Sequence, residues 1–226
     1  MDVPIVFLNC QNLYQVGQHT TRSPGSASQL AQKVADLAQT VLKVFGGPPA
    51  LIGLCEVGER ALAQQVADAV APSLYQGLWS GPPPKSRSGE PHTALVLLHD
   101  PARLALTGKQ DQGPKSVSAR CKWLAVELQA AGGSFWAVVV HWKSRYGASR
   151  AMTEPGRANS AREIGEFWLT QGRQTSQAII LLGDLNCEPG EAPLQEQANR
   201  TAVRHLSLHP PHQRRGTATS FEKLLI

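Results

Sequence analysis

The sequence predicts an α/β domain, and two observations carry this prediction. Short apolar runs at residues 3–8, 50–55 and 178–182 have the length of buried strands, and each runs directly into polar residues. The first two runs are separated by the apolar stripe of an amphipathic helix, at Leu30, Val34, Leu37, Val41 and Val44. With 226 residues and 42% hydrophobic side chains, the chain is long enough for one large core, so we expect a single domain over residues 1–226.

The remaining elements follow in order along the chain. We expect four more strands, at residues 74–79, 93–98, 123–128 and 135–140, the last two joined as a hairpin. A second helix has the apolar stripe Leu62, Val66, Ala69 and Val70. A third helix is expected over about residues 157–169, with Ala158, Ala161, Ile164 and Trp168 on one face.

Composition narrows the class of protein. No run approaches the roughly 18 apolar residues that a membrane-spanning helix needs, and the N-terminus lacks a secretory signal pattern, so we expect no membrane partner. The four cysteines are widely spaced without a CxxC pair, which favours reduced thiols and the cytoplasm over a zinc site or a disulfide framework. A net charge of +5 favours a polyanionic partner. No protein partner is evident.

Polar residues stand where four of the predicted strands end, at Asn9, Glu56, His141 and Asp184. If these strands share an exit edge, the four side chains meet at one mouth, as ligand sites in α/β sheets do. Each residue alone could simply begin a solvated loop. Together, an amide, two carboxylates and an imidazole are the groups that hold a hard cation and move protons beside a phosphate. Asn186 alternates with Asp184, so in an extended segment both would face the site while Leu185 turns inward.

Four ordered motifs read Leu-Asn-Cys-Gln-Asn-Leu at 8–13, Gly-Leu-Cys-Glu-Val at 53–57, Val-His-Trp-Lys-Ser-Arg at 140–145 and Leu-Gly-Asp-Leu-Asn-Cys-Glu-Pro at 182–189. They resemble the motifs of the endonuclease/exonuclease/phosphatase superfamily, in the bacterial branch with Asn-x-Glu-Asn-Leu and His-Trp-x-Ser-Arg patterns. Residues 94–101 and the Glu-Pro-Gly-Arg segment at 154–157 also resemble that branch, so the likeness spans nearly the whole chain.

The resemblance implies a DNase I-like fold, a four-layer αββα sandwich of two mixed sheets with the site at one edge. It implies that Glu56 holds Mg²⁺, with Mn²⁺ as a substitute, and that Asp184 and Asn186 handle the attacking water or the leaving group and orient the phosphate. His141 resembles the histidine that hydrogen-bonds the phosphate, and Asn9 helps to arrange the site. Arg120, Lys143 and Arg145 are candidates for phosphate contacts, with surface solvation as the alternative. Trp142 is expected to be a packing residue.

The chain departs from the family pattern at two places. Gln11 stands where the branch commonly has an acidic residue that assists the metal, so the predicted site has one fewer negative charge. After Asn186 we find no Asp-His or Asp-Gln pair of the kind carried by the last strand of the family. We therefore expect a fold lacking that strand, in a chain that is either C-terminally incomplete or diverged. His205, His209 and His212 lie near Pro210 and Pro211 and are interpreted as a loop rather than a metal cluster.

The predicted function is a Mg²⁺-dependent phosphodiesterase, foremost a nuclease acting on DNA or RNA. The sequence does not choose between endonuclease and exonuclease cleavage. A phosphatase or a phospholipid phosphodiesterase on the same scaffold remains open, because no feature fixes the substrate. A non-catalytic nucleic-acid-binding module is the third alternative, favoured by Gln11 and the absent strand and opposed by the retention of Glu56, Asp184 and Asn186.

Overall fold

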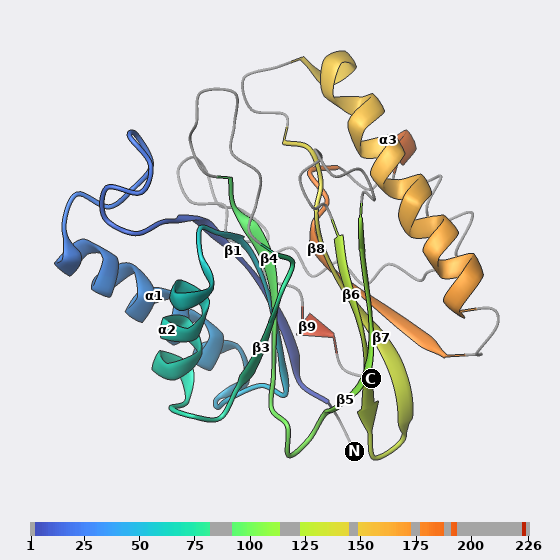
Figure 1. Ribbon diagram of the computed structural model, residues 1–226, viewed down its shortest axis with the longest axis horizontal. Helices are drawn as coiled ribbons and strands as arrows, with labels where there is room; N and C mark the ends of the chain where they lie inside the picture. The colour runs from blue at the N-terminus through green and yellow to red at the C-terminus, as the bar shows by residue number, and fades with distance from the viewer. Residues whose placement is uncertain are drawn as a thin grey trace.

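A computed structural model describes residues 3–81, 92–113, 123–144, 149–172, 177–187, 191–193 and 223–224. Two β-sheets lie face to face, with two helices on the outer face of one sheet and a third helix on the outer face of the other (Figure 1). This is the four-layer arrangement that the resemblance implied. It follows from the sequence pattern, because each helix has one apolar stripe and each central strand is apolar on both faces.

The first sheet has the strand order β3-β4-β2-β1-β9, with bounds Gln76–Trp79, Ala94–His99, Leu51–Val57, Ile5–Leu13 and Lys223–Leu224. The central strands β1 and β2 are parallel, and their other neighbours are antiparallel. Strand β9 pairs with β1 only at Ile5 and Val6. Among the described residues, no strand after Asn186 carries an Asp-His or Asp-Gln pair.

The second sheet has the order β5-β6-β7-β8, with bounds Ala105–Gly113, Trp123–Ala130, Gly133–His141 and Ala178–Asp184. Strands β6 and β7 form the predicted hairpin, and β8 runs parallel to β7. The sequence pattern missed β5. Its residues are mostly polar and exposed, so the strand has no apolar alternation and is held by pairing with β6.

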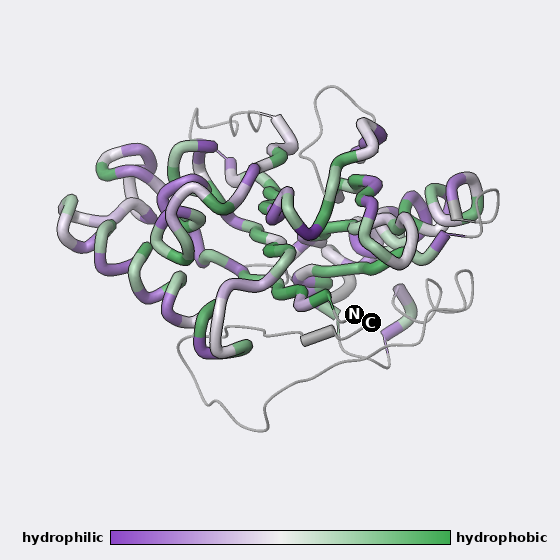
Figure 2. Tube along the Cα trace, turned by 90° about the horizontal axis from the view of Figure 1, so that it is seen from below, coloured by the Kyte–Doolittle hydropathy of each residue, from purple (hydrophilic) through white to green (hydrophobic). Residues whose placement is uncertain are grey.

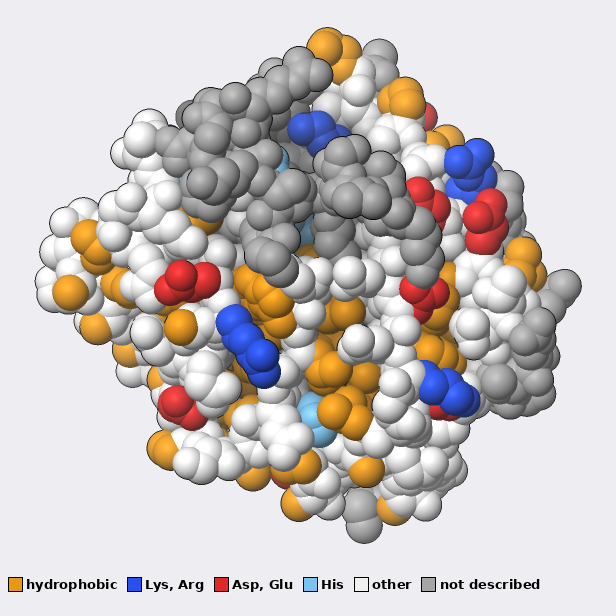
Figure 3. All heavy atoms as spheres, in the orientation of Figure 1, with side chains coloured by type: hydrophobic (Ala, Val, Ile, Leu, Met, Phe, Trp, Pro, Cys, Tyr) orange, Lys and Arg blue, Asp and Glu red, His pale blue; other side chains and the backbone are white. Residues whose placement is uncertain are grey.

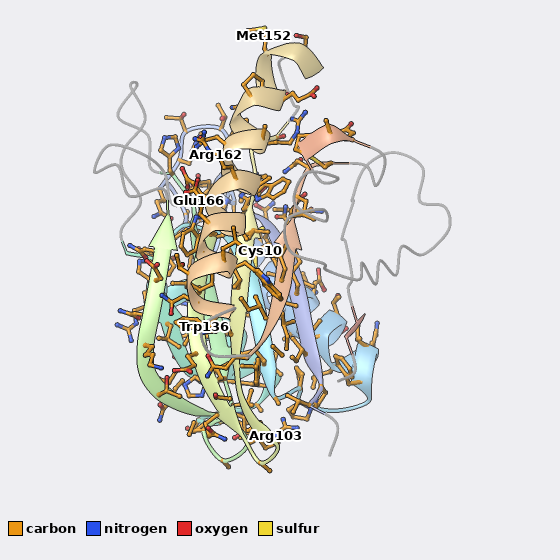
Figure 4. All side chains as sticks on the ribbon, turned by 90° about the vertical axis from the view of Figure 1, so that its right-hand side faces the viewer. Cys10, Arg103, Trp136, Met152, Arg162 and Glu166 are labelled. Atoms are coloured by element: carbon orange, nitrogen blue, oxygen red, sulfur yellow. The ribbon has the colours of Figure 1, made fainter. Side chains whose placement is uncertain are left out.

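Helices α1 (Ala27–Phe45) and α2 (Arg60–Val70) cover the first sheet, and α3 (Arg150–Phe167) covers the second. The side chain of Ser26 caps α1 by accepting from the backbone N–H of Gln29, and Gly46 ends the helix in the left-handed region with φ 71°. Helix α3 passes into a π-helical turn, η1 (Trp168–Gly172). In Figure 4, α3 turns Arg162 and Glu166 outward and lies over Trp136 of β7.

Three apolar clusters separate the four layers. One lies between α1, α2 and the first sheet, the next between the two sheets, and the last between the second sheet and α3. Figure 2 shows the hydrophobic segments along the strands in the middle of the molecule and the hydrophilic turns of the helices facing outward. The sheets approach closely at Gly53, where an added Cβ would lie 2.9 Å from Cγ2 of Val139.

Two of the expected helices differ in detail from the structure. Helix α3 begins at Arg150, not near residue 157, and continues through Pro155. Its face against the sheet includes Arg157, which is fully buried, in place of the expected Ala158. In α2, Ala69 is exposed and Ala63 and Ala67 are buried. Small residues give a weak apolar signal in a sequence, which therefore does not predict which of them a helix buries. The packing angle of each helix against its sheet decides this.

No helix within the described residues is long and apolar enough to cross a membrane.

Candidate active site

The topology brings four strand segments from two sheets to one edge. Strands β7 and β8 are parallel and in register, so His141 pairs with Asp184 at their shared end. In the first sheet, Asn9 of β1 pairs with Cys55 of β2, next to Glu56. Strand β1 packs against β8 across the interface between the sheets. The predicted convergence of Asn9, Glu56, His141 and Asp184 is therefore present in the fold.

A single amide nitrogen links the two carboxylates. Nδ2 of Asn9 donates to Oε1 of Glu56 at 3.2 Å and to Oδ2 of Asp184 at 3.1 Å. Its own carbonyl oxygen, Oδ1, accepts from the backbone N–H of Gln11 at 2.8 Å, which fixes the orientation of the amide. Asn9 is 8% exposed, so this arrangement lies below the protein surface. The residue therefore holds a carboxylate from each sheet in place.

Glu56 has contacts on both carboxylate oxygens. Oε2 accepts from the backbone N–H of Asn12 at 2.8 Å, and Oε1 lies 3.5 Å from Nε2 of His141. The side chains of Glu56 and His141 are 18% and 13% exposed, so solvent and a ligand can reach them. The carboxylate is oriented by the protein and still open at the surface.

Backbone strain gathers around this edge. Among the described residues, five non-glycine positions have positive φ, and four belong to the site: Gln11 at 49°, Asn12 at 60°, Glu56 at 59° and Asn186 at 49°. Such conformations cost about 1–3 kcal/mol each and persist where the surrounding structure holds them. The pairing of β1 with β2, and of β2 with β4, is irregular here. Asn9 and Glu56 thus lie at a bulged part of two strands. The sequence had indicated that the strands end at these residues, and the structure contradicts this prediction.

Asp184 and Asn186 form a turn rather than an extended pair. The backbone N–H of Asn186 donates to Oδ1 of Asp184 at 2.9 Å, and Nδ2 of Asn186 donates to the carbonyl oxygen of Trp142 at 3.2 Å. Because Asn186 has φ 49°, the expected strict alternation is broken, and its amide ties the end of β8 to the residue after His141. Leu185 is only half-buried and packs beside the cluster under α3.

Gly183 fixes the approach of β8 to β7. A Cβ at this position would lie 2.2 Å from the carbonyl oxygen of Val140 and 2.4 Å from its Cγ2. No larger residue fits without moving one strand. The glycine of the Gly-Asp-x-Asn motif therefore sets the position from which Asp184 reaches Asn9.

The donor set fits a hard divalent cation held by few protein ligands. Within the described residues, neither Glu56 nor Asp184 forms an ion pair with a lysine or arginine, and one amide nitrogen of Asn9 bonds to both carboxylates. That part of the chain contains no cluster of three His, Cys, Asp or Glu side chains arranged as a closed cage. Magnesium is usually held by one or two carboxylates with water and substrate oxygens, so the pair suits it.

Thiol groups near the site are not nucleophiles. Burial raises the pKa of Cys10 to about 12, and burial raises that of Cys187 to about 11, so both stay protonated at neutral pH. Cys10, labelled in Figure 4, lies in β1 between Asn9 and Gln11, with its side chain in the core under α1 and α2. A lysine from α1, Lys33, lies close by, and burial lowers its pKa.

Of the three basic residues predicted to contact phosphate, the structure describes only Lys143. Lys143 is exposed just after β7, whereas Arg120 and Arg145 lie outside the described residues, as do His205, His209 and His212. On the face in Figure 3, the Lys and Arg side chains of the described residues stand apart and do not gather in one patch. Trp142 is fully buried, which confirms that it is a packing residue.

Two residues without a predicted role form hydrogen bonds at the site or next to it. Arg157 is fully buried, and its NH1 donates to Oγ1 of Thr153 at 2.8 Å and to the carbonyl oxygen of Lys143 at 3.4 Å. The sequence drew attention to Arg157 only through the resemblance of its segment. Asn12 was part of a motif, but its backbone N–H is the group that binds Glu56. Side-chain patterns carry no signal for such a contact.

A hollow of about 800 Å³ lies at the other end of the sandwich, beside the starts of the strands that carry the site. Its lining includes Val3, Ala50, Gly133 and Ala178 and is mostly apolar. The charged lining residue Arg103 is already bonded to Asp100 and to the carbonyl oxygen of Pro48. Figure 4 shows Arg103 and Met152 at opposite ends of the molecule. The hollow lacks converging reactive groups, so we assign the chemistry to the edge around Glu56.

A sequence model described as the Endonuclease/Exonuclease/phosphatase family matches residues 18–207. No curated protein sequence matches the chain. Among solved structures, the catalytic domain of human Nocturnin with bound sulfate is similar at a TM-score of 0.58 and 18% identity, over 88% of this chain and 70% of that one.

Two further solved structures have the same fold. Beta toxin from Staphylococcus aureus, in a hairpin-deletion form, gives a TM-score of 0.63 at 13% identity, over 91% of this chain and 74% of that one. TDP2 from D. rerio, complexed with a single-strand DNA product, gives 0.57 at 13% identity, over 87% of this chain. The chain spans 65% of the length of that TDP2 chain. At these identities the similarity establishes the fold alone.

Proposed function

Because the chain belongs to the endonuclease/exonuclease/phosphatase family, we propose that it is a divalent-metal-dependent phosphodiesterase acting on nucleic acid. The observation that carries the proposal is the link from Asn9 to both Glu56 and Asp184, with His141 beside Glu56. This places two carboxylates, an amide and an imidazole at one partly exposed edge. A phosphodiester is anionic and resists attack by hydroxide. Hydrolysis therefore needs groups that offset the negative charge and position the attacking water, and these four side chains are of the required types.

Glu56 is the residue that would hold the cation, Mg²⁺ or in its place Mn²⁺, with Gln11 beside it. When bound, the ion supplies positive charge against the non-bridging phosphate oxygens. Asp184 takes the proton of the attacking water as the new bond to phosphorus forms. The bond from phosphorus to the leaving oxygen then breaks, and that oxygen takes a proton from solvent. His141 donates to the phosphate, and Asn186 orients Asp184 through its backbone N–H.

Nucleic acid is proposed as the substrate on two grounds. The net charge of +5 favours a polyanion, and exposed Lys143 lies two residues after His141. The fold is also that of D. rerio TDP2, which was solved with a single-strand DNA product. A cytoplasmic location is part of the proposal, favoured by the wide spacing of the four cysteines without a CxxC pair.

Cleavage assays with purified protein test the proposal. End-labelled duplex DNA, single-stranded DNA and RNA would be incubated with Mg²⁺, Mn²⁺ or EDTA, and inositol phosphates and phospholipid vesicles would be tested in parallel. We expect cleavage of a nucleic acid that EDTA abolishes. Cleavage of only the small phosphates or lipids would overturn the substrate, and binding without cleavage would favour the binding module.

Two carboxylate-to-amide changes provide matched variants. Glu56→Gln removes the metal-binding charge and should lower kcat/KM by at least about a hundredfold. Glu59 lies three residues further along the chain, and its side chain makes no capping bond to α2. The kcat/KM of Glu59→Gln should therefore be close to that of the wild type. Equal activity of both variants would remove Glu56 from the mechanism.

A further inference from the structure

The turn formed by Gln11 and Asn12 is held from the outer layer of the fold. Both residues lie in the left-handed region, with φ 49° and 60°. Helix α1 packs against β1 (Figure 1). Its half-buried residue Lys33 lies at this turn. Nζ of Lys33 donates to the carbonyl oxygen of Gln11 at 2.6 Å and to that of Asn12 at 3.2 Å. An ammonium group thus bonds to the carbonyls of both strained residues.

One peptide group connects Lys33 with Glu56. The carbonyl oxygen of Gln11 and the N–H of Asn12 belong to the same planar unit and point in opposite directions. The carbonyl oxygen accepts from Lys33, and the N–H donates to Oε2 of Glu56 at 2.8 Å. A positive charge at one end and a negative charge at the other polarise this peptide group and strengthen both hydrogen bonds.

The orientation of Glu56 depends on that plane. With Oε2 held by Asn12, Oε1 is turned toward Nδ2 of Asn9 and Nε2 of His141. Rotation of the peptide group would release Oε2 and let the carboxylate turn away from the other site residues. The neighbouring N–H, that of Gln11, donates to Oδ1 of Asn9, so the same turn also orients the amide that joins the two carboxylates.

We propose that Lys33 is a positioning residue for the active site: its ammonium fixes the Gln11–Asn12 peptide plane, and this plane orients the Glu56 carboxylate for the divalent cation. The role of the cation rests on the proposed function, whereas the coupling between Lys33 and Glu56 belongs to the protein alone. The hydrogen bonds of Lys33 go to the carbonyl oxygens of the turn, so its positioning role runs through the turn.

Hydrogen exchange tests the coupling without metal or substrate. In ¹⁵N-labelled full-length protein kept in EDTA, Lys33→Met should speed exchange of the Asn12 amide by about tenfold or more, because the isosteric side chain cannot donate. Lys43→Met, an exposed change on the same helix, should leave this amide unchanged. Wild-type exchange at Asn12 in Lys33→Met would overturn the proposal, as would a uniform rise along α1 and β1, which indicates a purely structural lysine.

A second variant changes Glu56, at the other end of the peptide link from Lys33. Glu56→Met removes both acceptor oxygens and should also speed exchange at Asn12, and adding Lys33→Met to it should have less effect than in wild type. The Glu56→Met variant keeps the test open even if Lys33→Met fails to fold, since loss of the acceptor should by itself speed exchange of the Asn12 amide. Unchanged exchange there would refute the peptide link.

Calorimetric titration with Mg²⁺ then separates this inference from the proposed function. We expect about tenfold weaker binding in Lys33→Met, binding close to wild type in Lys33→Arg, and no change in Lys43→Met. If Mg²⁺ does not bind the wild type, the proposed function fails while the exchange data still decide the coupling. If Lys33→Met binds Mg²⁺ as the wild type does, the positioning role is refuted.

Discussion

His141 and Asp184 are register partners at the shared end of two parallel strands, and this pairing joins two motifs that lie 43 residues apart. The preceding pair in the ladder is Val140 with Gly183. The contact is so close that Gly183 has no room for a side chain. The position of Asp184 therefore depends on the lack of a side chain at the preceding residue, Gly183.

Gly183→Ala is expected to destabilise the protein by at least about 2 kcal/mol, because the new Cβ would overlap the backbone of Val140. Displacement of β8 should also remove Asp184 from Asn9 and abolish hydrolysis. Urea unfolding measures the first effect. Gly132→Ala, in the β6–β7 turn with nothing within 4 Å of the added Cβ, is the control and should be close to neutral. Equal stability of the two variants would contradict the close approach.

Asn9→Asp should make the stability of the protein dependent on divalent cations. The substitution replaces the amide donor with a third carboxylate beside Glu56 and Asp184, and in EDTA at neutral pH it should cost about 1–3 kcal/mol. Added Mg²⁺ should raise the thermal midpoint of the variant more than that of the wild type. An equal rise in both proteins would argue against a cation between these carboxylates.

Gln11→Glu should strengthen cation binding. Gln11 stands beside Asn9, at a position where a carboxylate would add the negative charge that the branch commonly has. We expect Mg²⁺ affinity to rise by about tenfold, since ligand charge sets the affinity of hard-cation sites. Calorimetric titration measures it. Gln39→Glu, on the exposed side of α1, makes the same change in net charge and should have little effect. A similar gain in both variants would mean that net charge alone is responsible.

Glu127→Gln should flatten the loss of stability in acid. Oε2 of Glu127 accepts from Thr107 at 2.6 Å and lies 3.1 Å from Nζ of Lys109. The hydrogen bond from Thr107, with help from Gln177 and Lys109, holds the pKa of Glu127 below its ordinary value of 4.5, although burial acts in the opposite direction. A carboxyl with a lowered folded-state pKa contributes stability above pH 4.5, and this contribution is lost as the pH falls through the folded-state value.

Unfolding measured from pH 7 to pH 2.5 tests this expectation. The Glu127→Gln variant should be less stable than the wild type at pH 7, and the difference should shrink below pH 4.5. Glu166→Gln, on the outer face of α3 with its side chain 63% exposed, should show no such dependence. A constant difference across the pH range would mean that the charge of Glu127 is not involved.

The sequence by itself determined the class of fold and the candidate residues of the site. Apolar runs and three- to four-residue spacing located most of the strands and all three α-helices, because burial requires that periodicity. Strands β5 and β9 were the exceptions, since a polar strand held by its neighbour leaves no apolar pattern and β9 has only two residues. The motifs indicated Asn9, Glu56, His141 and Asp184 as candidates for the site.

Only the tertiary structure decided how these residues act on one another. The bridge from Asn9 to two carboxylates joins the two sheets, and the peptide link from Lys33 to Glu56 joins α1 to the site. Neither could be read from the sequence, because such contacts depend on sheet register, on helix docking and on residues held at positive φ. Local patterns record which face of an element is buried, whereas the direction of a backbone N–H in a strained turn is set by the packing of the whole domain.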